Sequence, residues 1–389
     1  MSNLLRNDHN VYILGAGFSR DAGLPLISDF LSQMRDGYDW LIQQGREREA
    51  MAVDEVLKFR LAAASAAYWV NLDLENIEEL FSLAFANTDG IATSMQLAIA
   101  ATLDYARKKS GPMLARMDVR QSENLFDSKA SKRPRWVKPT PGPQDTNGKG
   151  AYEIGVYALH VARLLGMLKD GKPQGENTFI TFNYDTLLED ALEELNLSFS
   201  YGSWISRKQH KGRQSLAEAI PVYKLHGSVN WTRTRGKINQ IAAVKTYDDL
   251  AKDARMPVLV PPTWKKVFEK EIESVWQEAI EKLNTATRII IIGFSMPPTD
   301  MHFKYLLAAG LKQNISLRQV LFVNPDKGND LKARVEKMLR QAYVDSGQIS
   351  FAKTGIGEFT GLQQSDGLGL HQLGRPTEHA LQYYASKQP

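Results

Sequence analysis

The chain has 389 residues, of which 43% are hydrophobic and 24% charged, and its formal net charge is +4. This composition is ordinary for a folded protein with a sizeable core, in one elaborated domain or two, and it excludes overall disorder. The chain contains no cysteine, which excludes disulfides, thiolate zinc sites, thiol nucleophiles and iron–sulfur ligation.

No segment of the sequence has the pattern of a membrane span or a signal peptide. The first residues, MSNLLRNDHN, lack an apolar core, and the longest strongly apolar run, RIIIIGF, is too short to cross a bilayer. We therefore expect a cytoplasmic protein without a membrane partner. Two basic stretches, KASKRPRWVK and SRKQHKGRQ, are compatible either with contact to nucleic acid or an acidic partner, or with solvated loops.

Runs rich in β-branched residues recur along the chain, and most are apolar at consecutive positions. Continuous apolarity is typical of strands that are covered on both faces of a parallel sheet. Turn residues and then helical periodicity follow several runs, as in ITFNYDTLLEDALEEL. We therefore predict an α/β fold with a Rossmann-like, doubly wound, mostly parallel sheet. The predicted strands are Val11–Leu14, Thr178–Phe182, Pro221–Leu225, Val258–Val260, Arg288–Ile292 and Val320–Val323.

The first two predicted strands are too far apart in the sequence for a single crossover. Between them, LDLENIEELFSLAF and MQLAIAATLDYARKK have apolar residues at helical spacing, whereas KRPRWVKPTPGPQDTNGKG is rich in proline and turn residues. We predict a core formed by residues 1–35 and 176–360, and a large helical insertion over 36–175 with an irregular loop near 129–150. The glycine-rich residues 361–389 are predicted to form a tail.

A glycine turn follows the first predicted strand in VYILGAGFSRDAGLP, where Gly15 and Gly17 precede Ser19. Glycines let the backbone approach a pyrophosphate, and amides at the start of a helix point toward an anion. However, Arg20 occupies the third glycine position of a dinucleotide-binding fingerprint, and the Lys-Ser/Thr pair that closes a P-loop is absent. Alone, the turn is compatible with a plain tight turn as well as with a nucleotide site.

Polar side chains follow two later predicted strands. The segment TFNYD places Asn183 and Asp185 after one strand, and KLHGSVNW places His226 after another. Because ligands of open α/β sheets bind at the carboxyl ends of strands, we expect these side chains to converge near the glycine turn. Taken singly, a core histidine and an asparagine that forms a turn or caps a helix are the alternatives.

Five segments occur in the order in which one known family has its motifs: GAGFSRDAGLP, TFNYD, KLHGS, IIIIGFSMPPTD and LFVNPD. In these segments, which cover the core and about half of the chain, the sequence resembles the sirtuins, or silent information regulator-like proteins. The resemblance implies NAD as the substrate, cleaved at the bond between nicotinamide and ribose. It implies catalytic roles for Asn183, which would position the ribose and a water, and for His226, which would act as the general base.

The resemblance also implies residues that bind the dinucleotide. Asp185 would recognise the nicotinamide carboxamide, and other positions would contact the phosphates and the adenosine. These other positions are Gly15, Ala16, Gly17, Ser19, Gly293, Ser295 and Asn324. The implied chemistry needs no metal, because nicotinamide is already a cationic leaving group and the protein has only to orient the ribose, exclude bulk water and supply one base.

The sequence departs from the protein deacylases of that family. It lacks the cysteines of their zinc module, and PLISDFL lacks the arginine of their PDFR segment, so the match of Phe30 to their gating phenylalanine stays open. FNYD together with GFSMPPTD is more similar to a divergent bacterial branch whose members hydrolyse NAD in antiphage defence. We therefore expect an NAD hydrolase, with an ADP-ribosyltransferase, a deacylase or a non-catalytic NAD-sensing module as the alternatives.

The same resemblance implies partners. Cleavage of NAD stops an infected cell but would harm the host if it were unrestrained. We therefore expect a homo-oligomer that a separately encoded activator or sensor switches on. A HerA-type ring ATPase is the first candidate for that partner, and a short Argonaute is the second.

Three further residues near these segments allow two interpretations each. Asp300 and His302 in PPTDMHF could form an acid–base or metal pair, but a helix cap at Asp300 and a packing or nucleotide contact at His302 are favoured. Trp231, which follows HGSVN, could close a pocket, although core packing is favoured.

Overall fold

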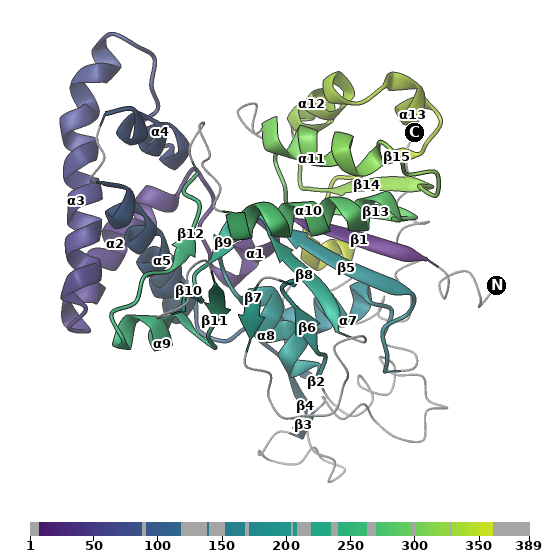
Figure 1. The fold of residues 1–389 in the computed structure, drawn as a ribbon, viewed down its shortest axis with the longest axis horizontal. Coiled ribbons are helices and arrows are strands. Elements are labelled where there is room, and N and C mark those ends of the chain that lie inside the picture. The colour runs from purple at the N-terminus through teal and green to yellow at the C-terminus, as the bar shows by residue number, and fades with distance from the viewer. Residues whose placement is uncertain are drawn as a thin grey trace.

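The computed structural model is organised around a sheet of seven strands in the order β15-β14-β13-β1-β5-β8-β6 (Figure 1). Neighbouring strands of this sheet are parallel throughout, which confirms the predicted Rossmann-like, doubly wound fold. The strands are β1 (His9–Leu14), β5 (Glu176–Thr181), β6 (Phe199–Ser200), β8 (Ile220–Lys224), β13 (Arg288–Ile292), β14 (Gln319–Val323) and β15 (Ile349–Ala352). The structure describes residues 8–87, 91–117, 138–139, 152–167, 171–203, 205–207, 219–234, 240–262, 270–296, 301–326 and 328–360.

The chain enters this sheet in its middle and fills it in two halves. From β1 it adds β5, β6 and β8 on one side, and it then returns past β1 to add β13, β14 and β15 on the other. Right-handed crossovers place the helices of the two halves on opposite faces of the sheet. The strand order therefore reverses between β1 and β13, and sheets of this kind bind their ligands at such a point, outside the carboxyl ends of the strands.

The central strands are buried on both faces, as their continuous apolar sequences predict. Val11 pairs with Ile289 and Leu14 with Ile292, and none of these four side chains is more than 1% exposed. Burial of an aliphatic side chain stabilises the fold by roughly 1.5–3 kcal/mol. The middle of the sheet is therefore a firm support for the turns that follow β1 and β13.

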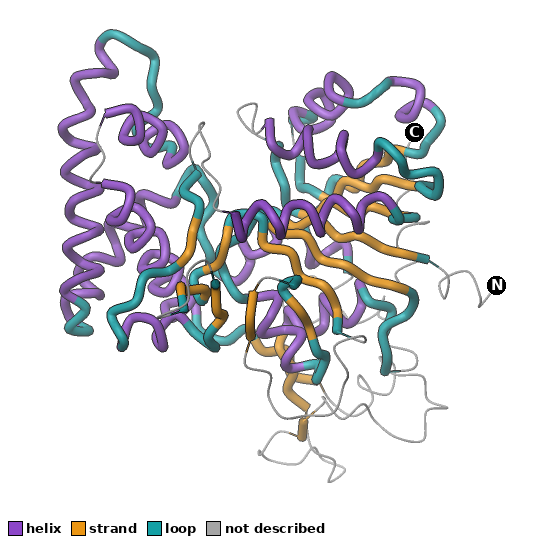
Figure 2. The backbone as a smooth tube through the Cα atoms, viewed as in Figure 1, coloured by secondary structure: helices purple, strands orange, loops and turns teal. Residues whose placement is uncertain are grey.

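Helices cover this sheet and connect its strands (Figure 2). The periodicity that predicts a helix after TFNYD is confirmed, because Leu187, Leu188, Ala191 and Leu192 lie buried on one face of α8. None of the helices in the described part of the chain combines the length and apolar composition that a membrane crossing needs. The helices around the sheet are α1 (Ala16–Ser19), α7 (Val156–Leu164), α8 (Leu187–Glu194), α10 (Lys270–Asn284), α11 (Met301–Leu311), α12 (Asp330–Met338), α13 (Gln341–Asp345) and α14 (Ile356–Phe359).

A helical layer with its own apolar core follows β1, and we call it the helical subdomain. In Figure 1 it lies at the left, beyond the carboxyl ends of the strands. Its core also takes in Tyr247, Leu250 and Leu259, which come from the chain after β8. The predicted helical insertion is thus present, beside the carboxyl ends of the strands. It consists of α2 (Phe30–Gln43), α3 (Glu47–Ala63), α4 (Ile77–Asn87) and α5 (Ile91–Ser110).

The boundaries of the insertion differ from the predicted 36–175. Helix α2 already begins at Phe30, and α7 packs in the core of the sheet, because its residues from Tyr157 to Leu164 are buried all round. A small antiparallel sheet of β2 (Leu114–Met117), β3 (Lys138–Pro139) and β4 (Tyr152–Gly155) lies between α5 and α7. Apart from β3, the predicted loop near 129–150 lies outside the described residues, as do the tail 361–389 and most of both basic stretches.

One predicted strand lies outside the main sheet, so the prediction that Val258–Val260 belongs to that sheet is wrong. Strand β12 (Val258–Leu259) pairs antiparallel with β9 (Gly227–Ser228), and Leu259 packs in the core of the helical subdomain. A short apolar run cannot distinguish these locations, since both bury it. The edge strands β6 and β15 are not among the predicted strands. A further small sheet consists of β7 (Ile205–Arg207), β10 (Trp231–Arg233) and β11 (Ile241–Ala243).

Helix α7 buries a histidine against the segment that follows α14. His160 is 1% exposed, and its Nδ1 lies 2.6 Å from Oγ1 of Thr360. Burial, together with the smaller effect of the nearby Arg163 guanidinium, lowers the pKa of His160 from 6.5 to about 3. His160 is therefore neutral in the folded protein at neutral pH, and folding penalises its charged form.

We expect this histidine to make the protein acid-sensitive. Because the folded pKa of His160 lies below the unfolded value, unfolding takes up a proton between about pH 6.5 and 3, so stability is intact above pH 6.5 and falls as the pH falls. Between pH 6.5 and 5 this residue should lower the free energy of unfolding by about 2 kcal/mol. Urea unfolding at pH 6.5 and at pH 5 measures this decrease in the free energy of unfolding. In His160→Gln the decrease should be smaller by this amount. An equal loss in both proteins would contradict the assignment.

Candidate active site

Two glycine turns interlock at the carboxyl ends of β1 and β13. The Gly15 amide donates to Ile292 O at 3.0 Å, and the Gly17 amide donates to Gly293 O at 2.8 Å. A Cβ on Gly17 would lie 2.8 Å from the Cα of Gly293, whose own φ is +65° and whose added Cβ would lie 2.2 Å from Phe18 N. Glycine is needed here because the two backbones touch. The amides of Gly15 and Gly17 are engaged within the protein, which differs from the expectation that they face an anion.

A chain of polar side chains runs from the glycine turn to the loop after β5. Asn183 donates from Nδ2 to Gly15 O at 2.9 Å and to Ser19 Oγ at 3.1 Å. The Ser19 hydroxyl, which is buried, donates in turn to Oδ2 of Asp185 at 3.0 Å. The other carboxylate oxygen accepts the Leu187 amide at 3.0 Å and so begins α8. The structure thus brings together four of the residues that the sequence analysis singles out.

The direction of the Asn183 amide follows from its partners. Gly15 O can only accept a hydrogen bond, so the NH₂ group of Asn183 must face the glycine turn. Its Oδ1 then faces away from that turn. Asn183 is half-buried, so this oxygen is available to accept a hydrogen bond from a hydroxyl group or a water.

His226 lies beside the same loop, at the end of β8. Its ring centroid is 5.2 Å from that of Phe182 and 6.1 Å from that of Tyr184, the two neighbours of Asn183 in the chain. The His226 residue is 6% exposed, and its carbonyl accepts the Val260 amide at 2.9 Å. His226 and Asn183 therefore belong to adjacent loops at one edge of the sheet, as predicted.

An aromatic wall from α10 and α11 borders His226. The Trp276 ring lies 6.4 Å from that of His226 and 6.0 Å from that of His302, and its Nε1 donates to Leu225 O at 2.8 Å. Phe294 stacks on Phe182 at 4.9 Å. His302 thus takes part in aromatic packing, whereas Asp300 lies outside the described residues. Within the described ranges, no three His, Asp or Glu side chains gather as a metal site would require.

The predicted adenosine-side residues lie at the ends of β13 and β14. Asn324 donates from Nδ2 to Phe294 O at 3.3 Å, and the half-buried Arg334 donates to Ser295 O at 2.8 Å. Both side chains therefore hold the segment that follows Gly293. Arg334 does not figure in the sequence analysis, because it comes from α12 and no motif includes it.

Three residues with open interpretations have packing or structural contacts. Phe30 is 8% exposed in the core of the helical subdomain, and Trp231 is fully buried with its ring 5.1 Å from that of Tyr201. Core packing is therefore confirmed for Trp231, and Phe30 is a core residue as well. Arg20, the residue that breaks the dinucleotide fingerprint, forms an ion pair with Asp29 and so ties the glycine turn to the start of α2.

A fully buried lysine lies beneath the site, and the sequence analysis does not identify it. Lys224, the last residue of β8, donates from Nζ to the backbone oxygen of Asp185 and to Glu189 Oε1, the latter at 2.9 Å. Tyr201 donates to the same Glu189 oxygen at 3.1 Å. The lysine thus links the loop that carries Asp185 to the end of β8, two residues before His226. A charged residue at the end of the apolar run PVYKL is the one sequence signal that indicates it.

We expect Lys224→Met to lower the free energy of unfolding by about 3–5 kcal/mol, because it leaves a buried carboxylate without its cation. Adding Glu189→Gln should restore much of this loss, since no unpaired charge is left. Urea unfolding at neutral pH measures both variants. As a control, Lys332→Met at the half-exposed pair with Glu336 should change stability by less than about 1 kcal/mol. A double variant no more stable than Lys224→Met would contradict the pairing.

Comparison with known proteins identifies one matching family. Residues 177–345 match the family model described as SIR2-like domain, a range that includes Asn183, Asp185, His226 and Gly293 but not β1. Among solved structures, the chain is similar to a mutant of a Sir2 homologue in complex with ADP-ribose, with 14% identity, 100% of both chains covered and a TM-score of 0.35. It is also similar to Sir2Tm bound to a propionylated peptide, with 14% identity, 90% of this chain and 89% of that chain covered, and a TM-score of 0.32. No curated protein sequence matches the chain. Residues 177–345, which carry Asn183, Asp185 and His226, are thus similar to a SIR2-like domain.

Proposed function

We propose that the chain hydrolyses NAD to nicotinamide and ADP-ribose. The observation that carries this proposal is the hydrogen-bonded series Gly15–Asn183–Ser19–Asp185 at the reversal point of the sheet, with His226 on the adjacent loop. Dinucleotides bind at this point in doubly wound sheets. The SIR2-like domain supports an NAD-utilising enzyme in general, and the finer assignment to hydrolysis is ours.

The chemistry of the substrate makes few demands on the protein. Nicotinamide leaves as a neutral molecule from a cationic ring, so the transition state resembles an oxocarbenium ion. The enzyme has to hold the ribose and a water in line and keep other water out. The Asn183 oxygen that faces away from the glycine turn suits a ribose hydroxyl or that water. Asp185, which accepts hydrogen bonds from Ser19 and from the Leu187 amide, is the group that would recognise the carboxamide.

His226 is the group that would take the proton. An imidazole ring nitrogen can accept a proton from a ribose hydroxyl or from a water and so act as a general base. The rings of Phe182, Tyr184 and Trp276 surround it and restrict access of bulk water on those sides. The base therefore acts in an environment that favours one bound water over many.

The alternatives differ in what else they need. A deacylase or an ADP-ribosyltransferase needs an acceptor cleft, and the family's gating phenylalanine has no counterpart in Phe30, which packs in the helical subdomain. A non-catalytic NAD-sensing module needs only binding. Hydrolysis is favoured because the sequence lacks the zinc-module cysteines and the PDFR arginine of the deacylases that it resembles.

We further propose that this activity depletes NAD in bacterial antiphage defence once a partner activates it. A homo-oligomer with a separately encoded activator is the arrangement we favour, with a HerA-type ring ATPase before a short Argonaute. Unrestrained cleavage of NAD would harm the host, so a resting state is required. The resemblance of FNYD and GFSMPPTD to the defence branch supports this role.

The test is to incubate the full chain, alone and with the product of the neighbouring gene, with NAD and to follow nicotinamide and ADP-ribose by mass spectrometry. We expect release of both in equal amounts. Asn183→Ala and His226→Ala should each lower the rate by about 10²- to 10⁴-fold, the usual contribution of a positioned general base or its equivalent.

The matched control is His9→Gln. His9 lies at the start of β1, at the opposite end of the strands from the site, and contacts Thr178 and Thr285. It should leave the rate within about twofold, while thermal melting shows that all three variants are folded. No release under any activating condition would refute the hydrolase. Release that persists in both site variants would instead refute the assignment of Asn183 and His226.

A further inference from the structure

A hydrogen-bonded path connects the helical subdomain to the backbone of His226. Gln96 on α5 donates from Nε2 to Leu259 O at 2.7 Å. Leu259 lies in β12, which pairs with β9, the strand directly after His226. The next residue, Val260, donates its amide to His226 O at 2.9 Å. Strand β12 therefore holds His226 from one side and is itself held by Gln96 from the other.

The contact between β9 and β12 leaves no room for adjustment. Gly227 has a φ of +80°, and a Cβ placed on it would lie 2.1 Å from Val258 O. Tyr184, which neighbours Asn183, donates its hydroxyl to Val260 O at 2.6 Å and accepts the Ser228 hydroxyl at 3.2 Å on its carbonyl. A shift of β12 would therefore move the His226 loop and the Asn183 loop together.

Strands β9 and β12 are too short to hold this arrangement on their own. Each has two residues, and a small isolated pair of strands is at best marginally stable in water. Leu259 is 3% exposed and packs in the core of the helical subdomain. The segment behind His226 is therefore held from two sides, because Leu259 packs with α5 and its neighbours whereas Val258 and Val260 pack in the core of the sheet.

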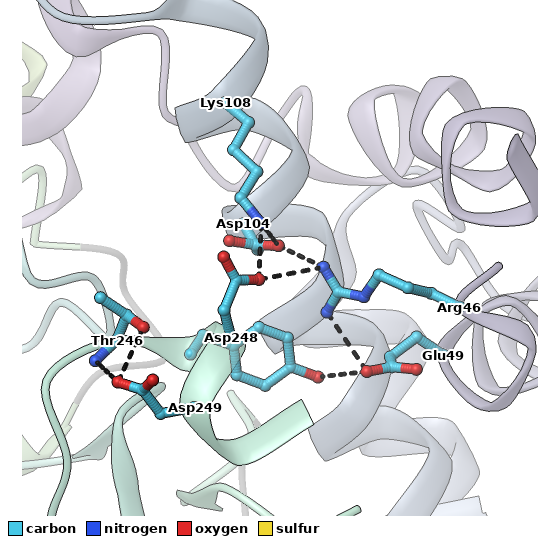
Figure 3. A network of polar contacts seen from close by, with 8 residues as sticks. Arg46, Glu49, Asp104, Lys108, Thr246, Asp248 and Asp249 are labelled. Atoms are coloured by element: carbon cyan, nitrogen blue, oxygen red, sulfur yellow. Dashed lines mark hydrogen bonds and ion pairs between the residues drawn. The ribbon is translucent and has the colours of Figure 1, made fainter. Parts of the chain in front are cut away.

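A second attachment fixes the helical subdomain against the chain that leads into β12 (Figure 3). Lys108 on α5 donates to Oδ1 of Asp248 on α9 (Tyr247–Lys252) at 2.6 Å. The Arg46 guanidinium is ion-paired with Asp104 and lies over the Tyr247 ring at 5.1 Å. The Arg46 and Asp104 side chains are 13% and 11% exposed, so they are poorly screened by water. These contacts keep α5, and with it Gln96, at a fixed place relative to β12.

We infer that Gln96 is a positioning residue that sets the place of His226 through β12, so that the helical subdomain controls the reactive loop. This inference rests on the proposed role of His226 as the base. Gln96 donates one hydrogen bond to a backbone oxygen. It lies on α5 of the helical subdomain, whereas His226 follows β8 of the sheet. Its effect on the reaction therefore has to pass through β12.

The test is a double-mutant cycle in the full chain with its activator. Gln96→Met keeps the size of the side chain and removes the donor, so kcat for NAD cleavage should fall by about 10- to 100-fold with little change in KM, as expected for a displaced catalytic group. Gln96→Lys, which restores a donor, should recover part of kcat. In a His226→Ala background Gln96→Met should have no further effect, because both changes act on one group. Additive effects would overturn the inference.

The matched control is Ser94→Ala on the same helix, whose hydroxyl bonds to Glu55 within the helical subdomain. It should leave kcat unchanged. The chain has seven histidines, so the imidazole NMR signal of His226 can be assigned from its loss in His226→Ala. Gln96→Met should shift this signal and Ser94→Ala should not. A shifted signal in a protein that never cleaves NAD would refute the proposed function alone, and an unshifted signal would refute the role of Gln96.

Discussion

The site depends on the contact between the two glycine turns at the carboxyl ends of β1 and β13. Gly17 and Gly293 approach so closely that neither can carry a side chain, and their amide and carbonyl groups bond across the gap. This contact joins the two halves of the sheet where the strand order reverses. It also fixes the direction of Gly15 O, the acceptor from which the polar series of the site begins. A loose turn at this point would leave Asn183 without a defined orientation.

The polar groups beyond this contact form a series of hydrogen bonds. Asn183 donates to Ser19, Ser19 donates to Asp185, and Asp185 caps α8 through the Leu187 amide. Beneath them, the buried ammonium group of Lys224 donates hydrogen bonds to the backbone oxygen of Asp185 and to the Glu189 carboxylate. Burying such a pair gains little stability relative to apolar packing. Its physical effect is geometric, because it ties the loop after β5 to the end of β8, which His226 follows.

The sequence predicts the sheet well where local patterns decide the outcome. The isoleucine run of β13 and the apolar strand β1 are unambiguous because both faces of the sheet bury them, and glycine and polar residues mark the strand ends. It fails where the partner is distant in the sequence. The apolar pair Val258 and Leu259 belongs to a strand beside the helical subdomain, and no local pattern shows this. Lys224, Gln96 and Trp276 are missed for the same reason, since each acts through a residue that only the fold brings near.

The helical subdomain is therefore part of the site rather than an addition to it. His226 follows the end of β8, and the next strand, β9, pairs with β12, whose two residues cannot define a position alone. Helix α5 supplies part of the missing stability through one hydrogen bond to Leu259 and the burial of that side chain, and Val258 and Val260 add to it by packing in the core of the sheet. An element that holds the reactive loop in this way can also release it. We propose that a movement of the helical subdomain relative to α9 shifts β12 and with it His226, so that a partner bound to the helices would act on the proposed base.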